Sequence, residues 1–188
     1  MGLLRWLCPD MVVERIYDLE PAQLQAHGIK ALLLDLDNTL TEWQSGAVDE
    51  RTREWVERAK ASGLRLCICS NSSRPWRVRD IAGALGIEHL PFASKPNPRS
   101  VQRALELVEA GPGEGAVVGD QLFTDILGGK LAGTTSIWVR PLSKREFIVT
   151  RLVRALEGLV IRALRKRGMW PEPGALPQRQ GGSGADTG

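Results

Sequence analysis

The sequence has 188 residues, of which 43% are hydrophobic and 25% are charged. That balance is typical of one soluble globular domain with a sizeable core. No apolar run approaches the roughly 20 residues of a membrane-spanning helix. The N-terminal residues MGLLRWLCPD also lack the apolar region and the cleavage site of a signal peptide.

The cysteines Cys8, Cys67 and Cys69 form an odd-numbered set, and two of them fall on one predicted strand. We therefore expect reduced thiols in a cytoplasmic protein. Cys67 and Cys69 suit strand packing better than redox chemistry. A zinc site is disfavoured, because His27 and His89 have no ligand-like spacing to the cysteines.

The net charge of +3 is distributed unevenly along the chain. Residues 143–168 carry eight Lys or Arg and two Glu, a balance of +6, and the remainder holds 17 basic and 20 acidic residues. The basic surplus thus belongs to one late segment, which suggests a specific role for that segment.

Helix and strand patterns alternate along most of the chain. Asp49 and Asn97 are suited to cap helices at their N-termini, and Pro98 suits a first helical position. The predicted helices are 20–28, 49–63, 75–86, 97–111 and 124–133, and the predicted strands are 29–36, 64–69, 115–120 and 135–140, with a further short strand before Lys95.

This alternation indicates right-handed βαβ units. We predict an α/β fold with a doubly wound parallel sheet over residues 1–142. A basic amphipathic helix is predicted at 143–168. Residues 169–188 are rich in Pro, Gly, Ser and Gln, and this composition predicts a disordered tail.

The segment KALLLDLDNTLTEW, residues 30–43, raises a physical problem. Asp35 and Asp37 end a buried strand, and side chains two residues apart on a strand share a face. Two carboxylates that lie so close repel one another unless a cation or a shared proton relieves the repulsion. The pair therefore predicts a site of chemistry.

Further polar residues follow the other predicted strands, and in a parallel sheet ligands bind beyond the carboxyl ends of the strands. Carboxylates can bind Mg²⁺ or act as nucleophile and general acid. Lysine and hydroxyl groups can hold phosphoryl oxygens. The residues expected at this edge are Asp35, Asp37, Ser70, Lys95, Asp120 and Asp125.

Four short motifs resemble the ordered motifs of the haloacid dehalogenase (HAD) superfamily. They are DLDNT at 35–39, SNS at 70–72, KP at 95–96 and GDQLFTD at 119–125. Their details are similar to the YqeG-type, subfamily IIIA phosphatases, a group that resembles the mitochondrial phosphatidylglycerophosphate phosphatases. The resemblance implies a Rossmann-like HAD core.

The resemblance also implies roles for individual residues. Asp35 would be the nucleophile and Asp37 the general acid and base. Mg²⁺ would bind Asp35, Asp37 through its backbone carbonyl, and Asp120, with Asp125 as a supporting carboxylate. The phosphate ligands would be Ser70, Asn71 and Lys95, although Asn71 also suits a local hydrogen bond that shapes its loop.

The spacing of these motifs leaves no room for a cap domain, which HAD enzymes insert either after the first motif or between the second and third. Residues 37–70 allow only a loop, a helix and a strand, and residues 73–95 allow a helix and a short strand. An open site favours a large substrate, such as a lipid headgroup or a macromolecule.

Residues 143–168 have an amphipathic helical pattern with two interpretations. The helix could lie on an anionic membrane, or it could dock on its own domain or on a partner with a solvated basic face. Nucleic acid is disfavoured as a ligand, because the segment has no interleaved aromatics. The apolar arc holds Ile148, Val149, Leu152, Val153, Leu156, Leu159, Val160 and Ala163, and the basic residues Arg151, Arg154, Arg162 and Arg165 lie opposite.

Together these features predict an Mg²⁺-dependent phosphomonoesterase that acts on phosphatidylglycerophosphate through an aspartyl phosphate. It would be cytoplasmic, with peripheral contact at the inner face of the membrane. Two alternatives remain open at this point. One is the same chemistry on a soluble protein or nucleotide substrate, and the other is a binding module that docks through its basic helix on a protein or RNA partner.

Overall fold

The structure is a computed structural model that describes residues 2–143 and 148–176. Its strands are β1 (Met11–Val13), β2 (Ala31–Leu34), β3 (Arg65–Cys69), β4 (Glu88–Leu90), β5 (Gly115–Gly119) and β6 (Thr135–Val139). Its helices are α1 (Pro21–Ala26), α2 (Glu50–Ala61), α3 (Pro75–Leu85), α4 (Pro98–Leu107), α5 (Leu127–Leu131) and α6 (Ile148–Lys166). Short 3₁₀ turns are η1 (Leu3–Leu7), η2 (Ile16–Asp18) and η3 (Pro112–Glu114), and η4 (Leu122–Ile126) is a π-helical turn.

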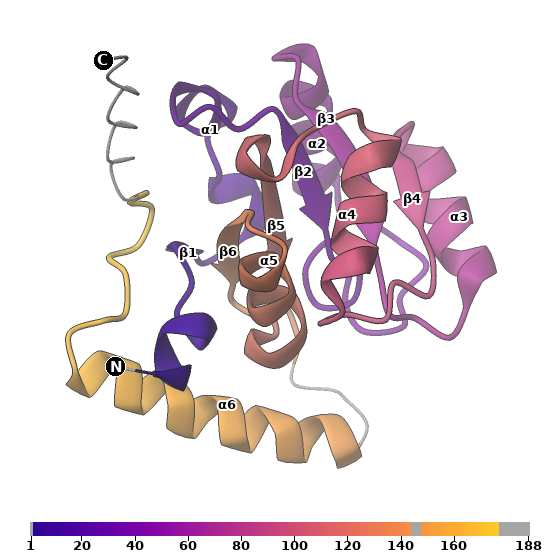
Figure 1. Cartoon of the computed structure of the whole chain (residues 1–188). Helices are drawn as coiled ribbons and strands as arrows, with labels where there is room; N and C mark the ends of the chain where they lie inside the picture. Colours follow the sequence, from indigo (N-terminus) through magenta and orange to yellow (C-terminus); the bar gives the residue numbers. More distant parts are fainter. Residues whose placement is uncertain (1, 144–147, 177–188) are drawn as a thin grey trace, which may run out of the picture.

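The strands form one parallel sheet in the order β1-β6-β5-β2-β3-β4 (Figure 1). The chain builds β2, β3 and β4 outward in one direction and then returns to add β5 and β6 on the other side of β2. This reversal makes the gap between β2 and β5 the topological switch point, where open α/β sheets bind ligands. The predicted α/β, doubly wound fold is confirmed.

Successive side chains of each strand point to opposite faces of the sheet, so they contribute to two apolar layers, one on each face. Leu32 and Leu34 face the layer that contains the buried residues of α2 and α3, whereas Ala31 and Leu33 face α4. Figure 1 shows α4 and α5 in front of the sheet, with α2 behind it. Helices on both faces explain why the central strands are apolar throughout.

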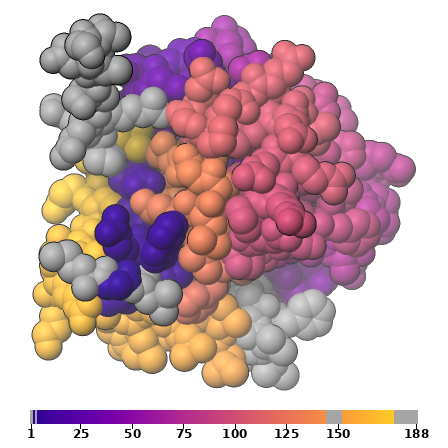
Figure 2. All heavy atoms as spheres, in the orientation of Figure 1, coloured from indigo at the N-terminus to yellow at the C-terminus, as the bar shows by residue number. Residues whose placement is uncertain are grey.

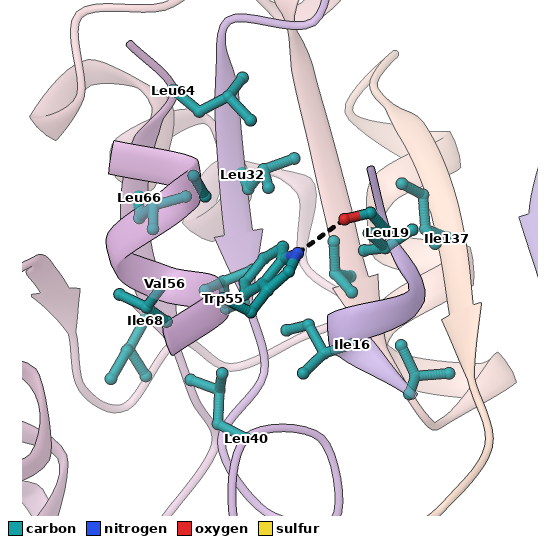
Figure 3. Close-up of a cluster of buried hydrophobic side chains, with 14 of the residues drawn as sticks. Ile16, Leu19, Leu32, Leu40, Trp55, Val56, Leu64, Leu66, Ile68 and Ile137 are labelled. Carbon is teal, nitrogen blue, oxygen red and sulfur yellow. Dashed lines mark hydrogen bonds between the residues drawn. The ribbon is translucent and has the colours of Figure 1, made fainter. Parts of the chain in front are cut away.

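Trp55 of α2 anchors the larger layer (Figure 3). Its indole ring is fully buried, and the indole N–H donates to the carbonyl of Leu19 at 2.7 Å. This bond satisfies the polar atom of an otherwise apolar ring. Asp49 caps the same helix as predicted, because its carboxylate accepts from the Thr52 backbone N–H at 3.1 Å.

The described residues contain no separate cap domain. Between β2 and β4 the chain adds only α2, β3, α3 and their loops. The carboxyl edge of the sheet is therefore uncovered by any lid of that kind, as predicted. No helix in the described residues is both long and apolar enough to cross a membrane.

Two segments behave differently from the sequence prediction. Strand β1 was not predicted, because three residues are too short to show a period. Disorder was predicted for residues 169–188, but the structure describes residues 169–176, and Pro173 forms an isolated parallel bridge with Val12 of β1. There the Gly174 N–H donates to the Val12 carbonyl at 2.9 Å, and Gln23 donates to the Gly174 carbonyl at 2.9 Å. Residues 177–188 lie outside the described part of the chain.

Helix α6 docks on its own domain, beside η1 (Figures 1 and 2). Leu164 is fully buried, and Val160 and Ile161 pack on a cluster that includes Leu7 and Leu122. The predicted helix at 143–168 is thus present from residue 148, and residues 144–147 lie outside the described chain.

The predicted division of α6 into an apolar docking arc and a solvated basic face is only partly right. Leu152, Leu156 and Leu159 are exposed, at 66%, 49% and 56%. Arg154, predicted on the solvated face, instead turns towards the sheet, where its side chain is 19% exposed. The helix therefore presents a leucine stripe, defined here as Leu152, Leu156 and Leu159, away from the domain.

Candidate active site

The predicted site residues come from the carboxyl ends of four adjacent strands. Asp35 follows β2, Ser70 follows β3, Lys95 lies between β4 and α4, and Asp120 follows β5. A cavity of about 250 Å³ opens at this edge. Its lining residues include Asp35, Asp37, Trp43, Ser70, Asn71, Ser72, Arg74, Arg77 and Gln121.

Lys95 is the buried cation beneath this cavity. Its Nζ lies 2.7 Å from Asp35 Oδ1 and 2.7 Å from Asp125 Oδ1. Burial alone would lower the pKa of Lys95, but Asp125 and Asp35 together outweigh that effect and raise it. Lys95 is therefore a fixed positive charge beside Asp35.

Asn71 holds the backbone of Lys95. Its side-chain amide donates to the Lys95 carbonyl at 2.9 Å and accepts from the Lys95 N–H at 2.8 Å. The structure thus gives Asn71 a positioning contact between β3 and the Lys95 loop. Ser70 is buried and lines the cavity, and its Oγ accepts from the Ser72 N–H at 3.1 Å.

Three acidic side chains meet at the switch point. One carboxylate oxygen from each of Asp35, Asp120 and Asp125 lies within 4.8 Å of the other two. Asp125 approaches this cluster across Gly119, where a Cβ atom would lie 2.3 Å from the Asp125 Cγ. Only glycine leaves room for the carboxylate at this point.

Burial perturbs these carboxylates. It raises the pKa of Asp35 to about 6, although Lys95 opposes the shift, and Asp125 and Asp37 add to it. Burial also raises the pKa of Asp120 well above its ordinary value, against the nearby charge of Arg154. Shifts of this kind cluster at functional sites.

Asp37 lies on the cavity wall but is held by a different cation. Arg77 of α3 is buried, and its Nη1 lies 3.0 Å from Asp37 Oδ1. The same guanidinium donates to Thr41 Oγ1 at 2.9 Å and to the Ser45 carbonyl at 2.7 Å. Arg77 thus fixes the loop after β2 around Asp37. Sequence reasoning missed it, because one arginine in a helix resembles any solvated residue.

Arg154 is a second arginine that the sequence did not indicate. Its guanidinium contacts the Asp120 carboxylate, and Nη1 also donates to the Asp120 carbonyl at 2.7 Å. Trp138 donates to that same carbonyl at 2.8 Å. The backbone and the side chain of Asp120 are therefore both anchored.

The donor set fits a divalent cation that prefers oxygen ligands. The Oδ1 atom of Asp120 is buried and has no hydrogen-bond donor among the described residues. A bare, buried carboxylate oxygen is costly unless something pairs with it. A small cation held by carboxylates would satisfy it, and Mg²⁺ binds such sites through one or two carboxylates and water.

The sequence of this chain matches a known family over most of the region that builds this site. Residues 14–133 match the haloacid dehalogenase-like hydrolases. The chain belongs to this family and is a HAD-type phosphatase.

Individual relatives agree with that assignment. The chain is 34% identical over 172 residues to the probable phosphatase YqeG of Bacillus subtilis, an alignment that covers 90% of this chain and 99% of YqeG. It is 33% identical over 162 residues to a mitochondrial phosphatidylglycerophosphatase of Saccharomyces cerevisiae, with 74% of this chain and 86% of the yeast protein covered.

Solved structures agree with the fold. An uncharacterized protein from Listeria monocytogenes superposes with a TM-score of 0.53 at 17% sequence identity, and the match covers 71% of this chain and 99% of that one. At this identity the likeness concerns the arrangement of the sheet and its helices.

Proposed function

We propose that the chain is an Mg²⁺-dependent phosphomonoesterase in which Asp35 forms an aspartyl phosphate. The observation that carries this proposal is the cluster of Asp35, Asp120 and Asp125 around the buried Lys95, with one oxygen of Asp120 unpaired within the described part of the chain. Asp35 lines the open cavity, so its carboxylate can reach a phosphate that enters from solvent.

The proposed reaction has two steps on this chain's own residues. An Asp35 carboxylate oxygen attacks the phosphorus, the bond from phosphorus to the leaving alcohol breaks, and Asp37 donates a proton to the leaving oxygen. Water then attacks the phosphorus of the aspartyl phosphate and gives a proton to Asp37. Inorganic phosphate leaves, and the Asp35 carboxylate is restored.

The remaining residues hold and neutralise charge. Lys95 and Ser70 would bind phosphoryl oxygens, and Asn71 holds the Lys95 backbone in place for that purpose. Asp35, the Asp37 carbonyl and Asp120 would hold Mg²⁺, with Asp125 in support. When bound, the cation would offset negative charge on the phosphoryl group.

We propose phosphatidylglycerophosphate as the substrate, which would place the reaction in phospholipid synthesis. The yeast relative bears the name of that activity. The cavity has no cap domain over it in the described residues, which suits a headgroup presented by a bilayer. The leucine stripe of α6 supplies a further argument, because three exposed leucines on one helix are uncommon without a partner surface.

The charges around this stripe support contact with an anionic membrane. Arg162 and Lys166 are exposed on α6 beside it. Exposed apolar side chains flanked by basic groups are typical of helices that lie in a membrane interface, and each basic group near an anionic surface adds about 1 kcal/mol. We therefore propose peripheral contact with the inner face of the membrane, from the cytoplasm.

Phosphate release from phosphatidylglycerophosphate in mixed micelles tests this proposal. We expect release with Mg²⁺, loss of release with chelator, and no release by Asp35→Asn. Hydrolysis of an aryl phosphate without hydrolysis of the lipid would support the proposed phosphomonoesterase chemistry and refute the lipid substrate. A panel of phosphoproteins and nucleotides would then identify the soluble alternative.

A further inference from the structure

Helix α6 supplies two polar side chains to the loop that follows β5, although α6 lies beyond the residues 14–133 that match the family. Arg154 contacts both the carboxylate and the carbonyl of Asp120. Glu157 accepts from the backbone N–H groups of Leu122 at 2.6 Å and Phe123 at 3.3 Å. One helix thus holds residues 120–123 from outside the sheet.

The two side chains also hold one another. Arg154 Nη1 lies 3.0 Å from Glu157 Oε2, and the Glu157 side chain is only 3% exposed. Because the guanidinium is planar and carries several donors, it can bind Glu157 and Asp120 simultaneously in one fixed geometry. Figure 1 shows α6 on the side to which the arrow of β2 points, which is the side of the site.

We propose that Arg154 is a positioning residue for the metal ligand Asp120, with Glu157 as its support. Arg154 occupies Oδ2 of Asp120, and the buried Oδ1 is left with no donor among the described residues. This division fixes the rotation of the carboxylate and reserves one oxygen for the cation. The inference rests on the proposed function, because it takes Asp120 as a ligand of Mg²⁺.

An arrangement in which Arg154 blocks the oxygen that Mg²⁺ needs would have the opposite effect on metal affinity. If the guanidinium competed with Mg²⁺ for the same oxygen, removal of Arg154 would strengthen metal binding. Groups that hydrogen-bond a ligating carboxylate orient it, and their loss typically weakens metal affinity roughly 10–100-fold. The separate oxygen atoms favour the orienting role.

The test is calorimetric titration of the full chain with Mg²⁺ alone, for wild type, Arg154→Met and Arg154→Lys. Arg154→Met keeps the apolar stem and removes every donor, so we expect affinity to fall roughly 10–100-fold. Arg154→Lys should bind with intermediate affinity. The matched control is Arg162→Met, an exposed arginine of the same helix whose one hydrogen bond within the described residues goes to the Gly158 carbonyl, and its affinity should equal that of wild type.

Circular dichroism establishes that each variant is folded. If Arg154→Met does not fold, Arg154→Lys decides: weaker binding than wild type supports the inference, and equal binding overturns it. Unchanged or tighter binding by folded Arg154→Met also overturns the inference and leaves the proposed function intact. A wild-type chain that binds no Mg²⁺ would instead contradict the proposed function, and the inference with it.

Discussion

Single residues at the switch point combine burial with charge, which is unfavourable for folding and useful for chemistry. Asp35, Asp120 and Asp125 are buried together, and Lys95 is the cation shared by two of them. The raised pKa of Asp35, about 6, reflects the cost of burying its charge. Sites that hold such groups trade stability for activity.

Asp35→Asn should stabilise the metal-free protein at neutral pH. The folded pKa of about 6 lies above the unfolded value of about 3.9, so the ionised carboxylate destabilises the fold above pH 6. The penalty disappears as pH falls through 6 towards 4. We expect Asn to add about 2 kcal/mol to the free energy of unfolding at pH 8, and little at pH 4.

Urea denaturation with chelator at a series of pH values measures this effect. Asp80→Asn, which changes an exposed carboxylate on α3, is the control. A stabilisation by Asp35→Asn that is the same at pH 4 and pH 8 would contradict the assignment of the raised pKa to Asp35.

Gly119→Ala should disable the site. The new Cβ would lie 2.3 Å from Asp125 Cγ, so Asp125 must leave its position against Lys95. We expect kcat/KM on an aryl phosphate to fall on the order of 100-fold and stability to fall by about 1–3 kcal/mol. Gly83→Ala, where a Cβ meets nothing within 4 Å, is the control. Wild-type kinetics for Gly119→Ala would show that activity does not require the close approach of Asp125 to residue 119.

Whole elements position the site through two arginines, Arg77, which is buried, and Arg154, which is 19% exposed. Helix α3 holds the loop after β2 through Arg77, and α6 holds the loop after β5 through Arg154. Each arginine binds a carboxylate and a backbone carbonyl at once. The loops that carry Asp37 and Asp120 are therefore held in place by α3 and α6 as well as by the sheet.

Arg77→Met should lower both the stability of the fold and the rate of the reaction. Removal of the guanidinium leaves Asp37, Thr41 and the Ser45 carbonyl without their shared donor. The Asp37 side chain is 25% exposed, so water offsets part of the loss, and we expect a cost of about 2–3 kcal/mol. Urea denaturation measures it, with the exposed Arg79→Met as the matched control. Equal stability of the two variants would show that Arg77 does not brace the loop.

Parts of this arrangement could be predicted from sequence and others could not. Asp35, Ser70, Lys95 and Asp120 were predictable, because parallel strands bring their carboxyl ends to one edge. Arg77 and Arg154 were not, because a helical arginine looks solvated until tertiary packing decides its direction. The short β1 and the contact of Gly174 with Val12 depend on long-range pairing that leaves no local pattern.

At the scale of the whole molecule, helix α6 contacts the candidate site with one face and carries the exposed leucine stripe on another. The inner face of α6 reaches Asp120, and its outer face carries Leu152, Leu156 and Leu159. A membrane that binds the stripe would therefore bind the same helix that holds Asp120, the proposed metal ligand.

Replacement of the three stripe leucines by Gln should reduce binding to anionic vesicles by about tenfold or more, because their apolar surface could no longer enter the interface. Stability should change little, because these side chains are exposed. A vesicle co-sedimentation assay measures the binding. The matched control replaces Leu107 and Leu131, each 46% exposed on other helices, by Gln. Equal binding by the two variants would remove the membrane argument.

The most direct test of the central claim is to trap the covalent intermediate. Protein mixed with p-nitrophenyl phosphate that carries a radiolabelled phosphoryl group, in the presence of Mg²⁺, is quenched with acid and digested. We predict label on the peptide that contains Asp35, more label in Asp37→Asn because its second step is slowed, and none in Asp35→Asn. Rapid phosphate release with label on no peptide, or on a peptide without Asp35, would contradict the proposed mechanism.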